Sequence, residues 1–176
     1  DAARVVEAVR RHNPRILAVA GNCDHPDVAA YLDDDGIGLH GAHRVVEGVA
    51  FLGVGGSLPC PVHTPNQLSE QELAALLWAA ADGLDPALPW VLLSHQPPRD
   101  TAVDVVHGGM HVGSRSVRDF ILLHEPLVCF TGHIHEAAGT DTLGRTRLAN
   151  PGPVRGGRCA RAELDDGLTA LDIRHC

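Results

Sequence analysis

The sequence of 176 residues contains no lysine, so all 14 of its basic residues are arginine. This absence excludes phosphate binding by a P-loop lysine, Schiff-base catalysis and serine–lysine nucleophilic chemistry, because each needs an ε-amino group. Positive charge is also in deficit, with a formal net charge of -8 at pH 7. A general nucleic-acid-binding surface needs a basic face, so we expect no such binding.

Long hydrophobic runs are absent as well. No apolar stretch approaches the roughly 18 residues needed to cross a bilayer, and no secretory signal peptide is visible. Hydrophobic residues nevertheless make up 44% of the chain and charged residues 20%, which is enough apolar material for the core of one domain. We therefore expect a single domain over residues 1–176, located in the cytoplasm and not associated with a membrane.

Cysteine pairs with metal-site spacing are missing too. The five cysteines include no C-x-x-C pair, and their number is odd. Such a set is typical neither of a disulfide framework nor of a cysteine-rich zinc site. We expect reduced thiols in a cytoplasmic protein. The cysteines are Cys23, Cys60, Cys129, Cys159 and Cys176.

The order of helical and apolar segments indicates an α/β fold. Helical spacing or capping signals predict helices over 2–12, 26–32, 69–81 and 114–124. Short apolar runs predict strands over 16–20, 49–54, 90–93 and 127–131. The tail predicts successive antiparallel strands over 146–150, 158–164 and 168–174, with a hairpin turn at 165–167. This alternation predicts one layered α/β domain.

Histidine is the residue in excess, with 12 copies, and several follow predicted strands directly. Asn22 follows the run 16–20, His95 follows 90–93, and His133 and His135 follow 127–131. Taken singly, each is ordinary in a turn or a solvated loop. Ligands of an open α/β sheet bind at the carboxyl ends of its strands, however. The four together therefore favour a site for a hard or borderline divalent metal.

The motifs around these residues resemble those of the calcineurin-like metallophosphoesterases, in particular the small bacterial and archaeal branch. The resemblance implies a layered α/β/β/α sandwich that hydrolyses phosphomonoesters or phosphodiesters of a small phosphorylated substrate. It also implies two divalent metal ions (manganese, iron, zinc or nickel), with Asn22, His95 and His133 on one ion and His135 on the other. The motifs appear in the family's order, as Gly21-Asn22-Cys23-Asp24, Gly53-Val54-Gly55-Gly56-Ser57, Ser94-His95-Gln96-Pro97-Pro98, His111-Val112-Gly113-Ser114, Gly132-His133-Ile134-His135-Glu136 and Asn150-Pro151-Gly152-Pro153.

The same resemblance assigns further site residues. Cys23 and Asp24 fall at catalytic positions, although many relatives have a leaving-group-protonating histidine where this chain has Cys23. His111, Gly113 and Ser114 resemble the family's substrate-side loop. A helix start with Ser114 as N-cap explains that segment equally well, and both roles are compatible because helix N-termini attract phosphate.

One part of the family pattern is missing. The Asp-x-His and Gly-Asp-x-x-Asp motifs of the family precede the Gly-Asn element, and residues 1–20 contain neither. The sequence also begins with aspartate, and its only methionine is Met110. We therefore expect an N-terminally incomplete domain that lacks the first strands, binds metal weakly and has no meaningful turnover alone. For the complete enzyme, we expect activity to fall as the pH drops toward the imidazole pKa.

Two alternatives to a phosphoesterase remain at this stage. One is a non-catalytic metallophosphoesterase-like domain that acts in binding or scaffolding. The other is a different His-x-His metallohydrolase, such as a zinc amidohydrolase, which suits the dipeptide but not the Gly-Asn-Cys-Asp and Asn-Pro-Gly-Pro elements. The sequence does not determine the substrate, the metal or the oligomeric state.

Overall fold

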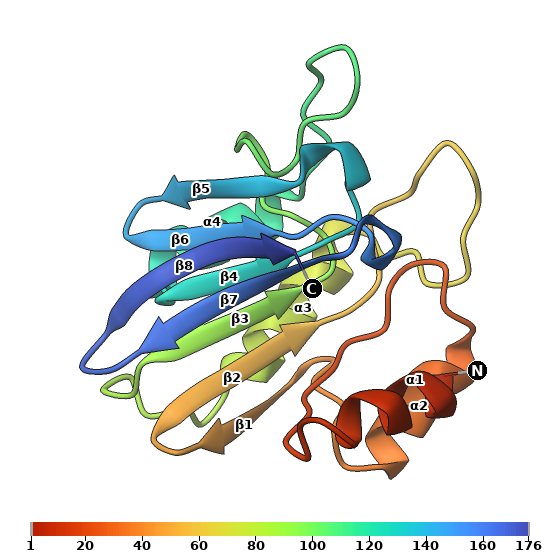
Figure 1. Ribbon diagram of the computed structural model, residues 1–176. Coiled ribbons are helices and arrows are strands. Elements are labelled where there is room, and N and C mark those ends of the chain that lie inside the picture. The colour runs from red at the N-terminus through yellow and green to blue at the C-terminus, as the bar shows by residue number, and fades with distance from the viewer. Residues whose placement is uncertain (1, 176) are drawn as a thin grey trace.

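A six-stranded sheet forms the centre of the protein in the computed structural model, which describes residues 2–175 (Figure 1). Its strand order is β1-β2-β3-β4-β6-β5. The four central strands are parallel to one another, and β1 and β5 are antiparallel to their neighbours at the two edges. The strands are β1 (Ala42–Val46), β2 (Val49–Val54), β3 (Trp90–Ser94), β4 (Val128–Thr131), β5 (Gly139–Leu143) and β6 (Thr146–Asn150).

Helices α3 (Glu70–Ala81) and α4 (Arg115–His124) cover one face of this sheet, as Figure 1 shows behind the strands. Alternate strand residues point to opposite faces, and those facing the two helices form the main core. This core contains the strand residues Ala50, Leu52, Val54, Trp90, Leu92, Cys129, Leu143 and Leu148 together with the helical residues Leu73, Leu77, Ala80, Val117, Phe120 and Ile121.

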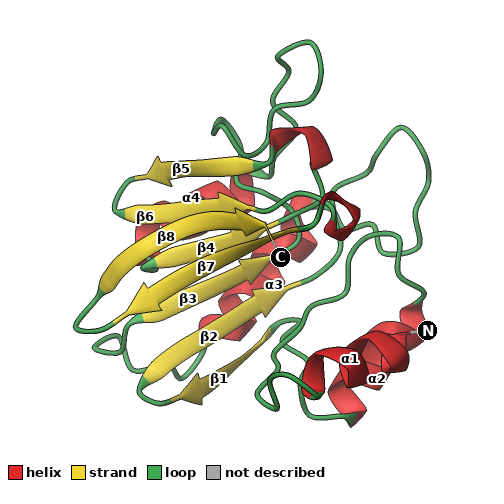
Figure 2. Ribbon diagram, in the orientation of Figure 1, coloured by secondary structure: helices red, strands yellow, loops and turns green. Residues whose placement is uncertain are grey.

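The other face of the sheet carries the antiparallel hairpin of β7 (Arg158–Leu164) and β8 (Leu168–His175), which Figure 2 shows in front of the sheet. Helices α1 (Ala2–Arg10) and α2 (Pro26–Asp34) lie to one side and form a small second core around Val6, Leu32 and Ile37. The chain also forms two short 3₁₀ helices, η1 (His135–Ala137) and η2 (Val154–Gly156). No helix formed by residues 2–175 is long and apolar enough to span a membrane.

The layered α/β class that the sequence predicts is confirmed, and each predicted helix is found with small shifts at its ends. The capping box at the start of α3 is present, since Ser69 accepts from the backbone of Glu72 and the Glu72 side chain bonds back to Ser69. Ser114 caps α4 by accepting from Val117 N.

The prediction of a strand over 16–20 is wrong. The segment is extended, but Ala18 makes only an isolated bridge with Gly38. The backbone of Ala18 forms hydrogen bonds with the backbone of Ile37 and Leu39. Within the described part of the chain, the segment joins neither sheet. One isolated bridge does not form a ladder of backbone hydrogen bonds, so this apolar run is not a β-strand.

The expected pairing of the tail is also wrong in one respect. β6 does not pair with β7; it runs parallel to β4 and pairs antiparallel with β5. Sequence analysis predicted neither β5 nor β1. β5 has few apolar residues, so it lacks the alternation of apolar and polar residues that predicts a strand. β1 is joined to β2 by Glu47 and Gly48, which both have positive φ, as a two-residue hairpin turn requires.

The expectation of five reduced thiols fails at Cys159, which is disulfide-bonded. Cys23, Cys60 and Cys129 are free. Pairing depends on the distance between cysteines in the fold, which their spacing along the chain does not reveal.

Glu70 connects the two helices on the back of the sheet. It is the first residue of α3, and its carboxylate accepts hydrogen bonds from Ser114 Oγ and from the backbone N–H groups of Arg115 and Ser116 at the start of α4. Burial alone would raise the pKa of Glu70, but these hydrogen bonds lower it below its usual range. The carboxylate thus satisfies amides that the first turn of α4 leaves without intrahelical partners.

We predict that Glu70→Ala lowers the free energy of unfolding by about 2 kcal/mol, the usual cost of losing hydrogen bonds to a charged group. Because the pKa of Glu70 is lowered in the folded state, its stabilisation is present above the unfolded-state pKa near 4.5 and is lost as the pH falls through the folded value. Urea unfolding at neutral and acidic pH measures both effects. The exposed neighbour variant Gln71→Ala is the control, and equal losses for the two variants would contradict this role.

Candidate metal centre

The residues predicted to bind metal lie at the carboxyl edge of the parallel strands. His95 follows the last residue of β3, and Gly132 and His133 follow the last residue of β4. The loop that carries Asn22 reaches the same edge, where Gly56 N donates to Ala20 O and His95 N donates to Val54 O. Three segments that are far apart in the sequence therefore meet at one place in the fold.

Asn22 brings two imidazole rings together. Its side-chain oxygen Oδ1 lies 3.0 Å from Nε2 of His95 and 3.2 Å from Nδ1 of His133. The ring centroids of the two histidines are 5.3 Å apart, and Asn22 is buried. Metal–nitrogen and metal–oxygen bonds of about 2.1 Å place neighbouring ligand atoms about 3.0–3.4 Å from one another around a shared ion. Each of the two imidazole nitrogens thus lies at ligand spacing from Asn22 Oδ1.

The donor set is incomplete for a typical metal centre. Among residues 2–175, no group of three or more His, Cys, Asp or Glu side chains is arranged to hold an ion. The cluster consists instead of two histidines and an asparagine. Imidazole nitrogens and an amide oxygen suit a borderline divalent ion, so the residues fit part of one such site.

Two glycines allow the close approach on which the cluster depends. A Cβ atom on Gly21 would lie 2.9 Å from Cε1 of His95, and one on Gly55 would lie 2.4 Å from the carbonyl oxygen of Ala20. Both distances are shorter than a real Cβ contact, so larger residues would push the Asn22 loop and His95 apart.

The turn that carries Asn22 is held by side chains on both sides. Asn66 donates through Nδ2 to the carbonyl oxygens of Gly21 and Asp24, and its backbone N–H donates to Asn22 O. The carboxylate of Asp24 accepts from Gly21 N at 2.7 Å. The structure therefore gives Asp24 a turn-forming role, while its catalytic role and that of the exposed Cys23 stay predictions.

His133 has a left-handed backbone conformation with φ of 63°, which a non-glycine residue adopts at an energetic cost. The next residue is fixed, because Asn150 Nδ2 donates to Ile134 O at 2.8 Å. Sγ of Cys60 lies 3.6 Å from Nε2 of His133. With Nε2 facing this thiol, Nδ1 faces Asn22.

Burial keeps the two histidines uncharged. It lowers the pKa of His95 to about 4, with the charges of His133 and His135 acting in the same direction and Asp24 opposing them. The pKa of His133 is lowered by burial and by His135, against an opposing effect of Glu136. Neutral imidazole is the form that binds metal, so the site stays competent to lower pH than an ordinary histidine pKa suggests.

His135 lies beside this cluster rather than within it. It is the exposed first residue of η1, and its charge acts on the pKa of both His95 and His133. The assignment of His135 to a second metal stays a prediction.

The predicted substrate-side residues have well-defined structural partners. Ser114 is fully buried and bonded to Glu70, and Gly113 packs against the backbone of Arg99 and donates to Asp104. His111 Nδ1 lies 2.6 Å from Asp104 Oδ1. The N-cap role of Ser114 is thus confirmed, while contact of these residues with substrate stays a prediction.

Sequence reasoning missed several residues that shape the site. They lie in loops without hydrophobic periodicity, so only their bonding in the fold identifies them. Asn150 is the exception, because it is the last residue of β6 and begins the Asn-Pro-Gly-Pro motif, although the sequence predicted no role for it. The residues that sequence analysis did not identify are Cys60, Asn66 and Asp104, and the role that it did not identify is that of Asn150.

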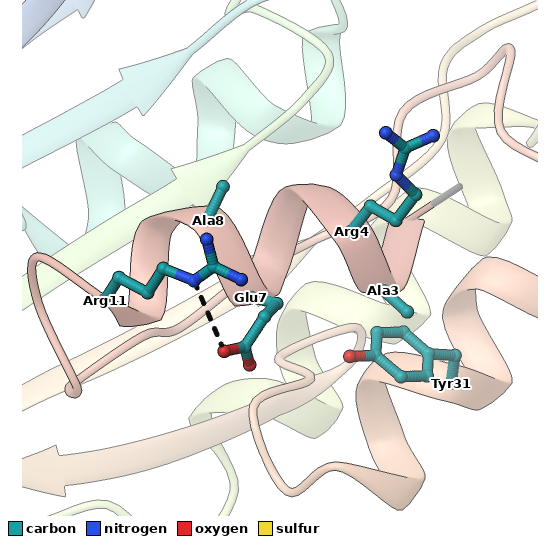
Figure 3. Close-up of a pocket in the computed structure, with 6 residues that line it drawn as sticks. All are labelled: Ala3, Arg4, Glu7, Ala8, Arg11 and Tyr31. Carbon is teal, nitrogen blue, oxygen red and sulfur yellow. Dashed lines mark ion pairs between the residues drawn. The ribbon is translucent and has the colours of Figure 1, made fainter.

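A separate hollow lies between α1 and α2 (Figure 3). An ion pair joins Glu7 and Arg11 along its wall, and Tyr31 of α2 lies at its other side. None of its lining residues belongs to the predicted site.

Comparison with known proteins identifies the family of the chain. A family model described as calcineurin-like phosphoesterase matches residues 2–137, so the chain belongs to the calcineurin-like phosphoesterase family. An uncharacterized protein of the archaeon Methanocaldococcus jannaschii, MJ1162, is 34% identical over 142 residues, which cover 78% of this chain and 64% of that protein. The chain thus spans less than two thirds of that relative. Members of this family usually bind divalent metals.

Solved structures share the fold. One crystal structure matches with a TM-score of 0.71 and 24% identity, covering 89% of this chain and 64% of that one. The crystal structure of TT1561 of Thermus thermophilus matches with a TM-score of 0.64 and 22% identity, covering 89% of this chain and 70% of that one. At these identities the likeness extends to the fold alone.

We predict that Gly21→Ala weakens binding of Mn²⁺ by about tenfold or more, the usual effect of displacing a residue that orients a ligand. The added methyl group would push against the His95 ring. Isothermal titration of the metal measures the change. Gly139→Ala is the matched control, because its Cβ would meet no atom within 4 Å. Unchanged affinity in Gly21→Ala would contradict the proposed packing.

We also predict that the metal-free protein loses stability as the pH falls from about 6.5 to about 4. In this window the unfolded chain takes up a proton on His95 and the folded protein does not, so the free energy of unfolding decreases by at most about 1.4 kcal/mol per pH unit. His95→Gln should flatten this dependence, whereas a substitution of the exposed His175 should not. Urea unfolding across the window tests it, and an identical slope for His95→Gln would refute it.

Proposed function

We propose that this domain is the metal-binding part of a phosphoesterase with a dinuclear divalent-metal centre, which hydrolyses a phosphomonoester or phosphodiester of a small molecule. The observation that carries the proposal is the convergence of Asn22 Oδ1 with His95 Nε2 and His133 Nδ1 at ligand spacing. Membership of the calcineurin-like phosphoesterase family supports it.

The residues would divide between two ions. Asn22, His95 and His133 would hold one, and His135 would contribute to the other. Manganese, iron, zinc and nickel all accept imidazole together with oxygen ligands. Bound ions of this kind neutralise charge on phosphoryl oxygens and acidify water. The chain's own contribution is to hold two neutral imidazoles at fixed positions and to leave the carboxyl edge of the sheet open to a substrate.

The proposal includes further ligands outside the residues described, from Asp-x-His and Gly-Asp-x-x-Asp motifs in the complete protein. An apolar groove supports additional strands here. It runs between the face of the sheet opposite α3 and α4 and the extended segment 13–17, and it is lined by half-buried Phe51, Leu93 and Phe130. Strands packed in this groove would remove that apolar surface from water.

The test compares the complete protein with the 176-residue chain on phosphomonoesters, phosphodiesters and cyclic nucleotides, with Mn²⁺, Fe²⁺, Zn²⁺ or Ni²⁺ added. We expect turnover by the complete protein on at least one ester class and none by the chain alone. His95→Gln and His133→Gln in the complete protein should each reduce turnover at least about 100-fold, while His175→Gln should not. Full activity of either ligand variant would contradict the assignment.

A non-catalytic binding or scaffolding role is the second candidate. The absence of a group of three His, Cys, Asp or Glu ligands among residues 2–175 favours it. The codons upstream of Asp1 separate the two candidates: both missing motifs there support the enzyme, and a start codon without them supports the scaffold.

A further inference from the structure

Asp104 is a fully buried carboxylate in the loop between β3 and α4. Its two oxygens accept from the backbone N–H groups of Asp100, Thr101 and Gly113, at 2.9 to 3.1 Å. The remaining short contact is with the ring of His111, at 2.6 Å from Nδ1. A buried carboxylate with this many donors organises the whole loop around one histidine.

The contact determines which nitrogen of His111 carries a proton. Burial alone would raise the pKa of Asp104, but the hydrogen bonds from His111, Thr101 and Gly113 lower it, so the carboxylate is ionised and accepts only. Nδ1 of His111 must therefore be the donor. Nε2, on the far side of the ring, is left for another partner, and the His111 side chain is 37% exposed.

The loop lies against both segments that carry the metal ligands. Gln96, the residue after His95, donates through Nε2 to the carbonyl oxygen of Val112 at 3.0 Å. On the other side, the backbone of His107 donates to Glu136, the residue after His135. His111 lies between these two attachment points. These two bonds tie the loop that carries His111 to the residues that follow His95 and His135.

We propose that His111 is the acid that protonates the leaving group, with Asp104 as its positioning residue; the proposal rests on the phosphoesterase function above. An oxygen from water forms a new bond to phosphorus as the bond between phosphorus and the leaving oxygen breaks. The leaving oxygen keeps the electron pair and takes the proton from Nε2 of the His111 imidazolium, which keeps its Nδ1 proton on the Asp104 carboxylate. The proton displaced from the attacking water restores His111, so the sum is one ester and one water converted to one alcohol and one phosphate product.

The structure favours His111 over the residues at the expected catalytic positions. The carboxylate of Asp24 already accepts from Gly21 N, and Cys23 is an exposed thiol on the same turn. His111 is held by an ionised carboxylate at a short distance, the arrangement that fixes the orientation of an imidazole.

The first test is the dependence of rate on the leaving group in the complete, Mn²⁺-loaded protein. A general acid matters most when the departing alcohol is weakly acidic, and it contributes roughly 10²–10⁴-fold. We expect His111→Gln to lower kcat about 100-fold or more for a phenyl ester and less than about fivefold for the 2,4-dinitrophenyl ester. Asp104→Asn should show the same pattern with about a tenfold loss for the phenyl ester, while Met110→Gln in the same loop should change neither rate.

The second test needs neither metal nor turnover. Nitrogen-15 NMR of the 176-residue chain should show His111 protonated at Nδ1, with a downfield proton resonance that disappears in Asp104→Asn. Retention of that resonance in Asp104→Asn, or a neutral ring protonated only at Nε2, overturns the positioning role. If Asp104→Asn does not fold, the His111→Gln variant tests the catalytic role instead. This variant should fold, because the half-exposed His111 ring is not part of either core.

The two proposals fail in different ways. A complete protein that hydrolyses no ester overturns the phosphoesterase function and the role of His111 with it. An active protein in which His111→Gln slows both esters by the same factor overturns only the assignment of His111 as proton donor.

Discussion

The close approach of the Asn22 loop to the carboxyl edge of the sheet is the contact on which the site depends. Gly21 leaves room for the His95 ring, and Gly55 leaves room for the backbone of Ala20. Without these two glycines, Asn22 Oδ1 could not lie within 3.0–3.2 Å of two imidazole nitrogens from different loops. The parallel strands bring His95 and His133 to one edge, but strand geometry alone does not place the asparagine there.

The same contact has an electrostatic cost. Two imidazoles are packed away from water, and burial lowers their pKa values so that they resist protonation. His133 also adopts a left-handed backbone conformation, which is unfavourable for a residue with a side chain. Both features reduce stability, and both leave the imidazoles neutral and fixed in orientation. Their coincidence at one place is the pattern expected where a fold serves binding rather than its own stability.

Sequence reasoning went furthest where the signal is local. The capping box of α3, the hairpin turn between β7 and β8 and the positions of His95 and His133 after β3 and β4 all depend on neighbours in the chain. It failed where the outcome depends on distant partners. The run 16–20 had the composition of a strand but only one bridging partner, and the pairing of β6 with β4 and β5 depends on a strand with little apolar character. Asp104, buried in a loop without periodicity, carried no local signal at all.

The most direct test of the central claim is anomalous X-ray diffraction from crystals of the chain soaked in Mn²⁺. The account predicts a manganese peak within bonding distance, about 2.1–2.3 Å, of Asn22 Oδ1, His95 Nε2 and His133 Nδ1 together. Absence of a peak at these atoms, with manganese bound elsewhere on the protein, would contradict it.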